Sequence, residues 1–544
     1  MTLSSHTGTG RVRWLRATWP ELLVLTALGA FLALLFLRPV WDIDIFWHIA
    51  AGREFRRLGH LVTLDPMGLD PSRRWVSFQW GYQLAVSAVH DLGGWPALRA
   101  LHAAILLAAF GLFHRLHRAL LGPWRGLAAT LLLLLLYQDR INVRPDVVNL
   151  LGLAVLLPLL LAESPAGDGS FCAPRLARGG WLGIVGLGLF MALWATVHAG
   201  GELNHLIVAL AVPIGVAVDK LRGRARHASV RAAALFWLGL ALPCVFVPHF
   251  LSGALDALVL VRSGGASIEE WSAPIAYVLG DAPQPPGRIV TGLLPYAALL
   301  AFLVLALRGQ LARLPLHRVG LALGFLGLSL LFVRFVYFTL PAALCLLPAL
   351  SGEVATSAPK EARRQWLTVA AVVTLAGLVW HTNVERLHGG LRGLVGDTHS
   401  DLDQRRYPEA SADYLHAVGF RGSIFAHARF GSYLLYRLHP GVRVLVDGRF
   451  AVPAETAADI QRLHEIHSAV PNDPSIATEV ERIIERYPAD VVVAEPPLFA
   501  SPETACPRWS RVFVAWNQEV WVRRDSVEVR RLEALGSLPL PVCP

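Results

Sequence analysis

The sequence predicts a polytopic α-helical membrane protein that ends in a soluble α/β domain. Hydrophobic residues make up 54% of the 544 residues and charged residues only 16%, against about 45–50% and about 25% in a typical soluble protein. The mean hydropathy of +0.48 is an average over the whole chain, so long stretches must be far more apolar. The five cysteines form no Cys/His cluster at ligand spacing, which excludes a disulfide framework and a zinc module.

Eleven segments are candidate membrane spans, each of which needs about 20 largely apolar residues. The first follows three arginines and ends in Arg-Pro-Val-Trp rather than in small residues, so we expect an uncleaved anchor and not a signal peptide. The ninth and tenth meet at Arg334 with almost no loop between them. The candidates are 21–40, 96–112, 125–138, 147–162, 181–198, 203–218, 232–250, 289–307, 319–333, 335–350 and 366–382.

The distribution of basic residues sets the expected orientation. Alternate loops carry most of the Lys and Arg with few acids, whereas the other loops balance them with Asp and Glu. The positive-inside rule then places the N-terminus in the cytoplasm, and eleven crossings place the C-terminus outside. Lys220 and Lys360 are the only lysines beside many arginines, which favours a GC-rich bacterial genome. We therefore expect a multi-pass protein of the bacterial inner membrane with a periplasmic or extracellular C-terminal domain. Because the basic residues are spread over many loops rather than gathered in one patch, we expect no nucleic-acid partner.

The chain divides into a transmembrane part, 1–382, and an extracytoplasmic α/β domain, 383–544. The first outer loop, 41–95, mixes aromatic and charged residues, which favours amphipathic helices at the membrane interface. In the tail, apolar periodicity and turn residues predict three helices and four strands. The helices are Tyr407–Val418, Ala454–Ala469 and Ser475–Tyr487, and the strands are Ser423–His427, Val442–Val446, Asp490–Ala494 and Val512–Trp516.

The exit from the first span is the most informative segment for chemistry. Asp42 and Asp44 lie two residues apart at the outer membrane boundary, among aromatic residues. Asp44 and His48 are four residues apart, so on a helix they share a face and could hydrogen-bond. Partial burial would raise a carboxylate's pKa, as a general base requires. The two carboxylates could instead hold a divalent cation, Mg²⁺ or Mn²⁺, or only cap a helix.

Arg140 and Arg144 form the second informative segment, a pair of arginines in a short outer loop. Arginines at this depth run against the positive-inside trend, and their guanidinium groups suit bidentate binding of a lipid phosphate. The alternative is that Asp139 and Asp146 in the same loop simply pair with them.

Three further residues are candidates on the same side of the membrane. His198 ends the fifth span and Glu269 lies in an outer loop, where a polar cap and a solvated charge are the plainer interpretations. Arg334 lies between two apolar spans, where a charge costs roughly 2.5–3.5 kcal/mol on insertion scales and therefore needs an anionic partner.

In the tail, two short motifs predict strand-end turns. They are Gly431–Tyr436 and Asp447–Arg449. Cys506 and Cys543 could form a disulfide in an oxidising compartment.

These motifs together resemble the GT-C glycosyltransferases, polytopic enzymes that use polyprenyl-phosphate sugars, and in particular a group of bacterial GT-C-like membrane proteins of unassigned substrate. The resemblance implies that an Asp directly after the first span is the catalytic base, assisted by His48, and that arginines bind the leaving lipid phosphate. It also implies that Asp65, Gln79, Trp80, His198 and Glu269 contact the acceptor or the sugar. The matching positions are Asp42, Asp44, Trp47, His48, Asp65-Pro66, Gln79-Trp80, Arg144-Pro145, Trp194, His198, Gly431, Tyr433 and Asp447–Arg449.

We therefore expect an integral-membrane hexosyl- or pentosyltransferase that moves a sugar, with inversion, from a polyprenyl-phosphate carrier to an extracytoplasmic glycan, lipid or protein. One alternative is a transporter or flippase of a lipid-linked or amphiphilic substrate, because prolines interrupt several spans. Another is a non-catalytic scaffold of envelope assembly, for which Asp42, Asp44 and Arg144 could all be replaced without effect.

Overall fold

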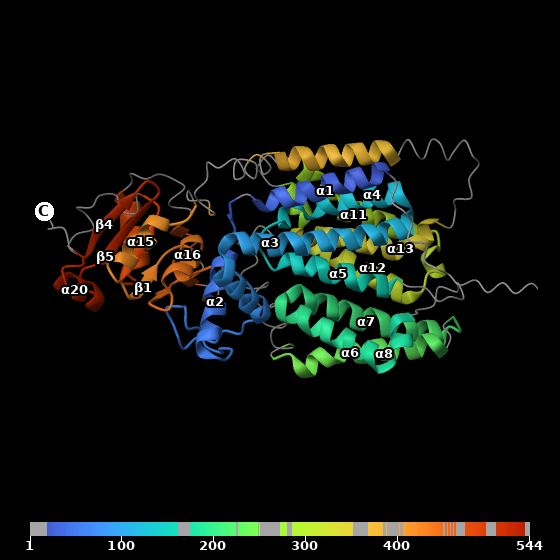
Figure 1. Cartoon of the computed structure of the whole chain (residues 1–544), viewed down its shortest axis with the longest axis horizontal. Helices are drawn as coiled ribbons and strands as arrows, with labels where there is room; N and C mark the ends of the chain where they lie inside the picture. The colour runs from blue at the N-terminus through green and yellow to red at the C-terminus, as the bar shows by residue number, and fades with distance from the viewer. Residues whose placement is uncertain are drawn as a thin grey trace, which may run out of the picture.

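A computed structural model shows a long helical bundle with a small sheet domain at one end and α2 (Asp44–Leu58) between them (Figure 1). The structure describes residues 19–37, 39–161, 174–224, 227–248, 250, 273–279, 286–351, 368–384, 388, 402, 406–449, 452–453, 455–456, 458–460, 462–463, 474–496 and 508–538.

The bundle consists of apolar helices, and each of the eleven candidate spans overlaps one of them. Among the described residues, three helices are long and apolar enough to cross a membrane by length and composition, Trp80–Leu121, Leu203–Leu221 and Arg288–Leu307. The helices of the bundle are α1 (Trp19–Leu37), α3 (Trp80–Leu121), α4 (Pro123–Tyr137), α5 (Asp146–Leu160), α6 (Pro174–Val197), α7 (Ala199–Leu221), α8 (His227–Phe246), α10 (Pro274–Val278), α11 (Pro286–Leu307), α12 (Leu316–Leu331), α13 (Thr339–Ser351) and the helix 368–384. Short 3₁₀ turns are η1 (Gln138–Arg140), η4 (Leu311–Arg313) and η5 (Val333–Phe338).

The C-terminal domain is a mixed five-stranded sheet with helices packed on it. The strand order is β2-β1-β3-β5-β4. Strands β2, β1 and β3 are parallel, β5 runs antiparallel to β3, and β4 pairs with β5 as a hairpin. The strands are β1 (Gly422–Phe425), β2 (Val442–Val444), β3 (Val491–Ala494), β4 (Trp509–Ala515) and β5 (Gln518–Arg523), and the helices are α15 (Glu409–Ala417), α16 (Ala428–Leu438), α18 (Pro474–Ile484) and α20 (Val527–Ala534).

Three features of this domain differ from the sequence prediction, and one of them is the additional helix α20. Gly431–Tyr436, expected to be a turn, lies inside α16, where every residue from 430 to 435 is buried. Strand β5 was not predicted, because its first five residues are all buried and a strand covered on both faces does not alternate. The other predicted strands coincide with β1 to β4, while most of Ala454–Ala469 and both Cys506 and Cys543 lie outside the described residues.

Helix α2 packs between the sheet domain and the bundle and contacts both. Its Phe46 is fully buried, with ring centroids 4.6 Å from Tyr407, 5.1 Å from Tyr433 and 5.6 Å from Trp95. The apolar residues of α2 are covered by α3 and α16. A Cβ at Gly52 would come within 2.0 Å of the Gln83 carbonyl, so only glycine permits this close approach of α2 to α3.

Candidate active site

The first part of the site joins the exit of α1 to the loop before α5. The Arg144 guanidinium forms ion pairs with Asp42, through Nε, and with Asp44, at 3.2 Å through Nη2. The Asp42 side chain is 1% exposed, whereas that of Asp44 is 28% exposed. Of the two carboxylates, only Asp44 is therefore accessible to a second molecule.

Asp42 also caps the helix that follows it. Its Oδ1 accepts a hydrogen bond from the backbone N–H of Asp44 at 2.9 Å, where α2 begins. Burial raises the pKa of Asp42 to about 7, in spite of the opposing charge of Arg144. The capping alternative is thus seen for Asp42, but the same carboxyl group additionally meets an arginine and titrates near neutral pH.

Asp146 is the centre of the second part of the site. It begins α5 and is buried. Its Oδ1 lies 3.7 Å from His198 Nε2 and 3.9 Å from Arg334 Nη2, and the charge of the buried Arg140 also acts on it. Arg334 therefore has the anionic partner that its position between two apolar segments required. We call the six residues Asp42, Asp44, Arg140, Arg144, Asp146 and Arg334 the polar cluster.

His48 lies beneath this cluster rather than on the surface. It is 1% exposed, its ring centroid is 3.7 Å from that of Trp47, and Nδ1 is 3.5 Å from the Gln83 side-chain amide. Burial, with the nearby charge of Arg144, holds the pKa of His48 well below its usual range. His48 is therefore a neutral imidazole at physiological pH. On α2, the Trp47 indole N–H donates a hydrogen bond of 3.4 Å to Asp44 Oδ1, and this contact orients the Asp44 carboxylate.

The carboxylates of the polar cluster are the candidate ligands for a divalent cation. Asp42 and Asp44 both face the Arg144 guanidinium, and the part of the chain that the structure describes holds no group of three or more His, Cys, Asp or Glu side chains placed to hold a metal ion. Because Mg²⁺ requires close to octahedral oxygen coordination, these residues as arranged do not fit Mg²⁺ or Mn²⁺.

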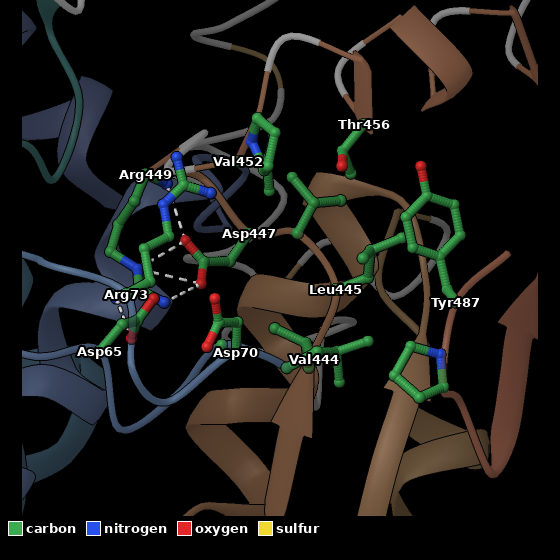
Figure 2. A pocket seen from close by; sticks show the side chains of 15 residues that line it. Asp65, Asp70, Arg73, Val444, Leu445, Asp447, Arg449, Val452, Thr456 and Tyr487 are labelled. Atoms are coloured by element: carbon green, nitrogen blue, oxygen red, sulfur yellow. Dashed lines mark hydrogen bonds and ion pairs between the residues drawn. The ribbon is translucent and has the colours of Figure 1, made fainter.

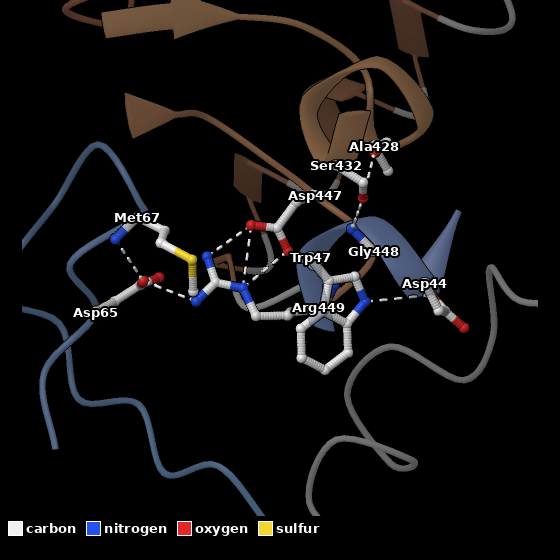
Figure 3. A network of polar contacts seen from close by, with 9 residues as sticks. All are labelled: Asp44, Trp47, Asp65, Met67, Ala428, Ser432, Asp447, Gly448 and Arg449. Atoms are coloured by element: carbon white, nitrogen blue, oxygen red, sulfur yellow. Dashed lines mark hydrogen bonds and ion pairs between the residues drawn. The ribbon is translucent and has the colours of Figure 1, made fainter. Parts of the chain in front are cut away.

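A turn of the sheet domain lies directly on Asp44. The turn Asp447–Arg449 follows β2, and a Cβ at Gly448 would come within 2.7 Å of Asp44 Oδ1 and 2.8 Å of Trp47 Cδ1. The Gly448 N–H donates to Ser432 Oγ of α16 at 2.8 Å (Figure 3). The predicted strand-end turn is confirmed here, and the fold places it against the accessible carboxylate.

A buried ion-pair clasp holds this turn in place. Arg449 donates to Asp447 at 2.6 Å through Nη2 and to Asp65 at 2.7 Å through Nη1 (Figure 3). Its guanidinium also lies 4.7 Å from the ring centroid of Trp75. All three charged side chains are 4% exposed. Asp65 of the first loop is thus placed in the clasp between loop and sheet domain, and the term clasp below means Asp65, Asp447 and Arg449.

The remaining predicted contact residues lie around the start of α3. Gln79 precedes α3 and Trp80 is its first residue. A Cβ at Gly81 would come within 2.7 Å of Thr196 Oγ1. The start of α3 therefore adjoins the end of α6, and His198 is the residue that directly follows α6. Glu269 lies outside the described residues.

Comparison with known proteins identifies the fold. No family model and no curated protein sequence matches the chain. The oligosaccharyltransferase of Archaeoglobus fulgidus, solved with a tethered acceptor peptide, aligns with a TM-score of 0.53 at 12% identity, over 88% of this chain and 69% of its own length. This chain has the GT-C glycosyltransferase fold.

Other GT-C structures align over most of this chain with lower TM-scores. ArnT from Cupriavidus metallidurans, solved with undecaprenyl phosphate, gives 0.49 at 16% identity, over 93% of this chain and 98% of its own length. The mycobacterial arabinofuranosyltransferase AftD gives 0.46 at 17% identity, over 92% of this chain and 41% of its own length. Since one fold can host several activities, the chemistry must be argued from the site.

Three residues of the site were missed by sequence reasoning or given no role in the chemistry. Asp146 was considered only as a local partner of the arginines, and Gly448 and Arg449 as parts of a turn that matches the GT-C-like group but was given no chemical role. Their contacts are made with residues far away in the sequence. The one local signal was the Asp-Gly-Arg motif itself, since a glycine between two charged residues after a buried strand is typical of a constrained turn.

Proposed function

We propose that the protein is an integral-membrane glycosyltransferase that moves a sugar, with inversion, from a polyprenyl-phosphate carrier to an acceptor outside the cytoplasm. The GT-C fold supports glycosyl transfer in general, and the polar cluster supports this particular chemistry because it sets an accessible carboxylate beside several arginines. The protein would be a hexosyl- or pentosyltransferase of the bacterial inner membrane, with its sheet domain on the outer side and with no nucleic-acid partner.

Asp44 is the general base of this proposal. The single observation that carries the assignment is exposure, since the Asp44 side chain is 28% exposed and that of Asp42 1%. A base must come within hydrogen-bond reach of the proton that it accepts, which a sealed carboxylate does not. Asp42 then acts as a positioning residue, which fixes the start of α2 and holds Arg144.

The proposed reaction is a direct displacement. The acceptor hydroxyl or amine attacks the anomeric carbon and passes its proton to Asp44 as the bond from that carbon to the phosphate oxygen breaks. The leaving polyprenyl phosphate gains negative charge, which Arg144, Arg140 and Arg334 stabilise. Preorganised charges of this kind supply a large part of the rate enhancement in many enzymes.

The location of the charges supports an enzyme over a transporter. Transporters usually bind substrate and coupling ions near the midplane of the membrane. The members of the polar cluster instead adjoin ends of helices: Asp44 begins α2, Asp146 begins α5, and Arg334 lies in η5 between α12 and α13.

The test compares Asp44→Asn with Asp42→Asn in purified protein, using a panel of polyprenyl-phosphate sugars. We expect Asp44→Asn to lower kcat by at least 100-fold, in line with typical contributions of general bases, and not to weaken binding of the lipid. Asp42→Asn should retain measurable transfer. Full activity of Asp44→Asn, or lipid binding by the wild type without any transfer, would refute the assignment and favour transport or a scaffold role.

A further inference from the structure

A cavity is lined in part by the clasp and by none of the residues of the polar cluster. It has a volume of about 190 Å³ and is formed jointly by the first loop and the sheet domain (Figure 2). Asp65, Asp70 and Arg73 come from the loop, and Asp447, Arg449 and Tyr487 from the sheet domain. Pockets for drug-sized ligands measure roughly 300–1,000 Å³, so this cavity suits a single ring.

The cavity wall is polar on one side and apolar on the other. Three carboxylates, those of Asp65, Asp70 and Asp447, stand against the guanidinium groups of Arg73 and Arg449. Leu445, Val452 and the Tyr487 ring form the apolar side (Figure 2). The excess of one negative charge disfavours a phosphate or another anion as the occupant.

Two polar groups of the wall retain hydrogen-bonding capacity. Asp70 uses one carboxylate oxygen, Oδ1, to accept from Ser72. Within the described residues, the Arg73 side chain makes no hydrogen bond and no ion pair, although the charges of Asp65 and Asp70 act on it. Arg449, by contrast, is fully engaged in the clasp. The wall therefore offers a donor fork and an acceptor next to an aromatic ring.

We propose that this cavity binds one sugar unit of a saccharide acceptor. A sugar hydroxyl both donates and accepts hydrogen bonds, so it can satisfy the Arg73 guanidinium and the Asp70 carboxylate at once. The apolar face of a sugar ring can pack against Tyr487 and Leu445. That the bound saccharide is the acceptor rests on the proposed function, but sugar binding itself can be measured without any transfer.

The clasp connects this cavity to the reacting carboxylate. Asp447 and Arg449 form part of the cavity wall, and the residue between them, Gly448, lies against Asp44. A sugar in the cavity would therefore touch the same turn that bounds the space around the proposed base. If the acceptor sugar that reacts lies at Asp44, the cavity would hold the next sugar of the acceptor chain, beside the turn.

The experiment compares Arg73→Ala with Arg74→Ala in the full-length protein. Arg74 is the matched control, because it is the next residue, is exposed and does not line the cavity. Binding of glucose, glucosamine, glucuronate, maltose, cellobiose and chitobiose is measured by calorimetry and by saturation-transfer NMR. We expect at least one of these sugars to bind the wild type and Arg74→Ala equally, and Arg73→Ala at least tenfold more weakly.

Two results would overturn the proposal. One is that none of these sugars binds the wild type, and the other is that Arg73→Ala binds them as tightly as Arg74→Ala. Preferential binding of inorganic phosphate in the same titrations would identify an anion site instead. Thermal melting of Arg73→Ala is expected to match the wild type, because the side chain makes no hydrogen bond or ion pair among the described residues.

Transfer assays separate this inference from the proposed function. If the wild type transfers sugar and Arg73→Ala raises the KM for a disaccharide acceptor without changing kcat, both hold. If the wild type transfers sugar and Arg73→Ala changes neither sugar binding nor KM, the cavity proposal fails alone. If sugars bind through Arg73 but no polyprenyl-phosphate sugar is ever turned over, the proposed function fails and the sugar site stands.

Discussion

Gly448 lies so close to Asp44 that a Cβ at this position would come within 2.7 Å of Oδ1. Asp44 follows the first helix of the bundle, whereas Gly448 follows the second strand of the sheet domain. The contact brings the two parts of the chain together at the most accessible carboxylate of the polar cluster. It explains why this turn carries a residue without a side chain.

The first prediction concerns this contact. Gly448→Ala should lower kcat/KM for sugar transfer by roughly 10- to 100-fold, because a displacement of about 1 Å at a reacting group can cost two orders of magnitude. Gly327→Ala in α12 is the matched control, since its Cβ would meet nothing within 4 Å. Unchanged kinetics of Gly448→Ala, with intact thermal stability, would show that the turn does not position Asp44.

The second prediction follows from the titration of Asp42. Burial raises the pKa of Asp42 to about 7, so the carboxyl group is mostly neutral at pH 6 and mostly ionised at pH 8. The ionised form competes with a lipid phosphate for Arg144. The Kd of a polyprenyl-phosphate sugar should therefore weaken by about three- to tenfold between pH 6 and pH 8, as expected for one added charge a few ångströms away.

This pH dependence is measured in the Asp44→Asn background, where the sugar is not expected to be transferred. The donor is a phosphodiester, so it lacks the second phosphate pKa of about 6 that a monoester would add. Adding Asp42→Asn should make the Kd nearly independent of pH. The same slope in both proteins would show that a different group titrates.

The third prediction concerns Asp146. Asp146→Asn removes the buried anion that faces Arg334 and Arg140, and loss of one partner of a buried pair typically costs about 3–5 kcal/mol. We expect the Tm to fall. Undecaprenyl phosphate should then raise the Tm more in the variant than in the wild type, because the lipid supplies the missing negative charge and bound ligand stabilises the folded state.

Asp139→Asn in the same loop is the control, since the Asp139 side chain is 44% exposed and lies 3.8 Å from Arg288. Its Tm should stay close to that of the wild type, because exposed ion pairs contribute little to stability. Equal lipid-induced shifts in Asp146→Asn and the wild type would argue against a phosphate site next to Asp146.

The fourth prediction concerns the clasp. Arg449→Ala leaves Asp65 and Asp447 buried without their cation, and the expected cost is again about 3–5 kcal/mol. Limited proteolysis should cut the chain between the bundle and the sheet domain faster than in the wild type. Arg443→Ala on the exposed face of β2 is the control, and equal cleavage rates of the two variants would contradict the role of the clasp.

Most of the helical architecture could be predicted because membrane helices are encoded locally. Each candidate span overlaps a helix, since a long apolar run signals its own conformation. Strand β5 and helix α16 could not be assigned in the same way. The residues of β5 are covered on both faces, and α16 contains a glycine and a serine next to aromatic residues, a composition that also suits a turn.

The candidate site was predictable only in part. Asp42 and Arg144 stand out because charges beside membrane segments are costly. Their mutual ion pair is not encoded locally, and neither is the pairing of Arg334 with Asp146. Such pairings depend on which helix ends are neighbours, and the hydrophobic pattern of each helix does not specify its neighbours.

The sequence by itself determined that the chain is a largely apolar, helical membrane protein that ends in an α/β domain, and it marked the acidic and arginine-rich segments that carry the proposed chemistry. These properties follow from composition and short-range periodicity. Tertiary structure decided that Asp42 is buried and Asp44 accessible, and it decided which carboxylate pairs with each arginine. It also decided that Gly448 lies against Asp44. Burial and long-range contacts arise only when distant segments pack together, so no local pattern determines them.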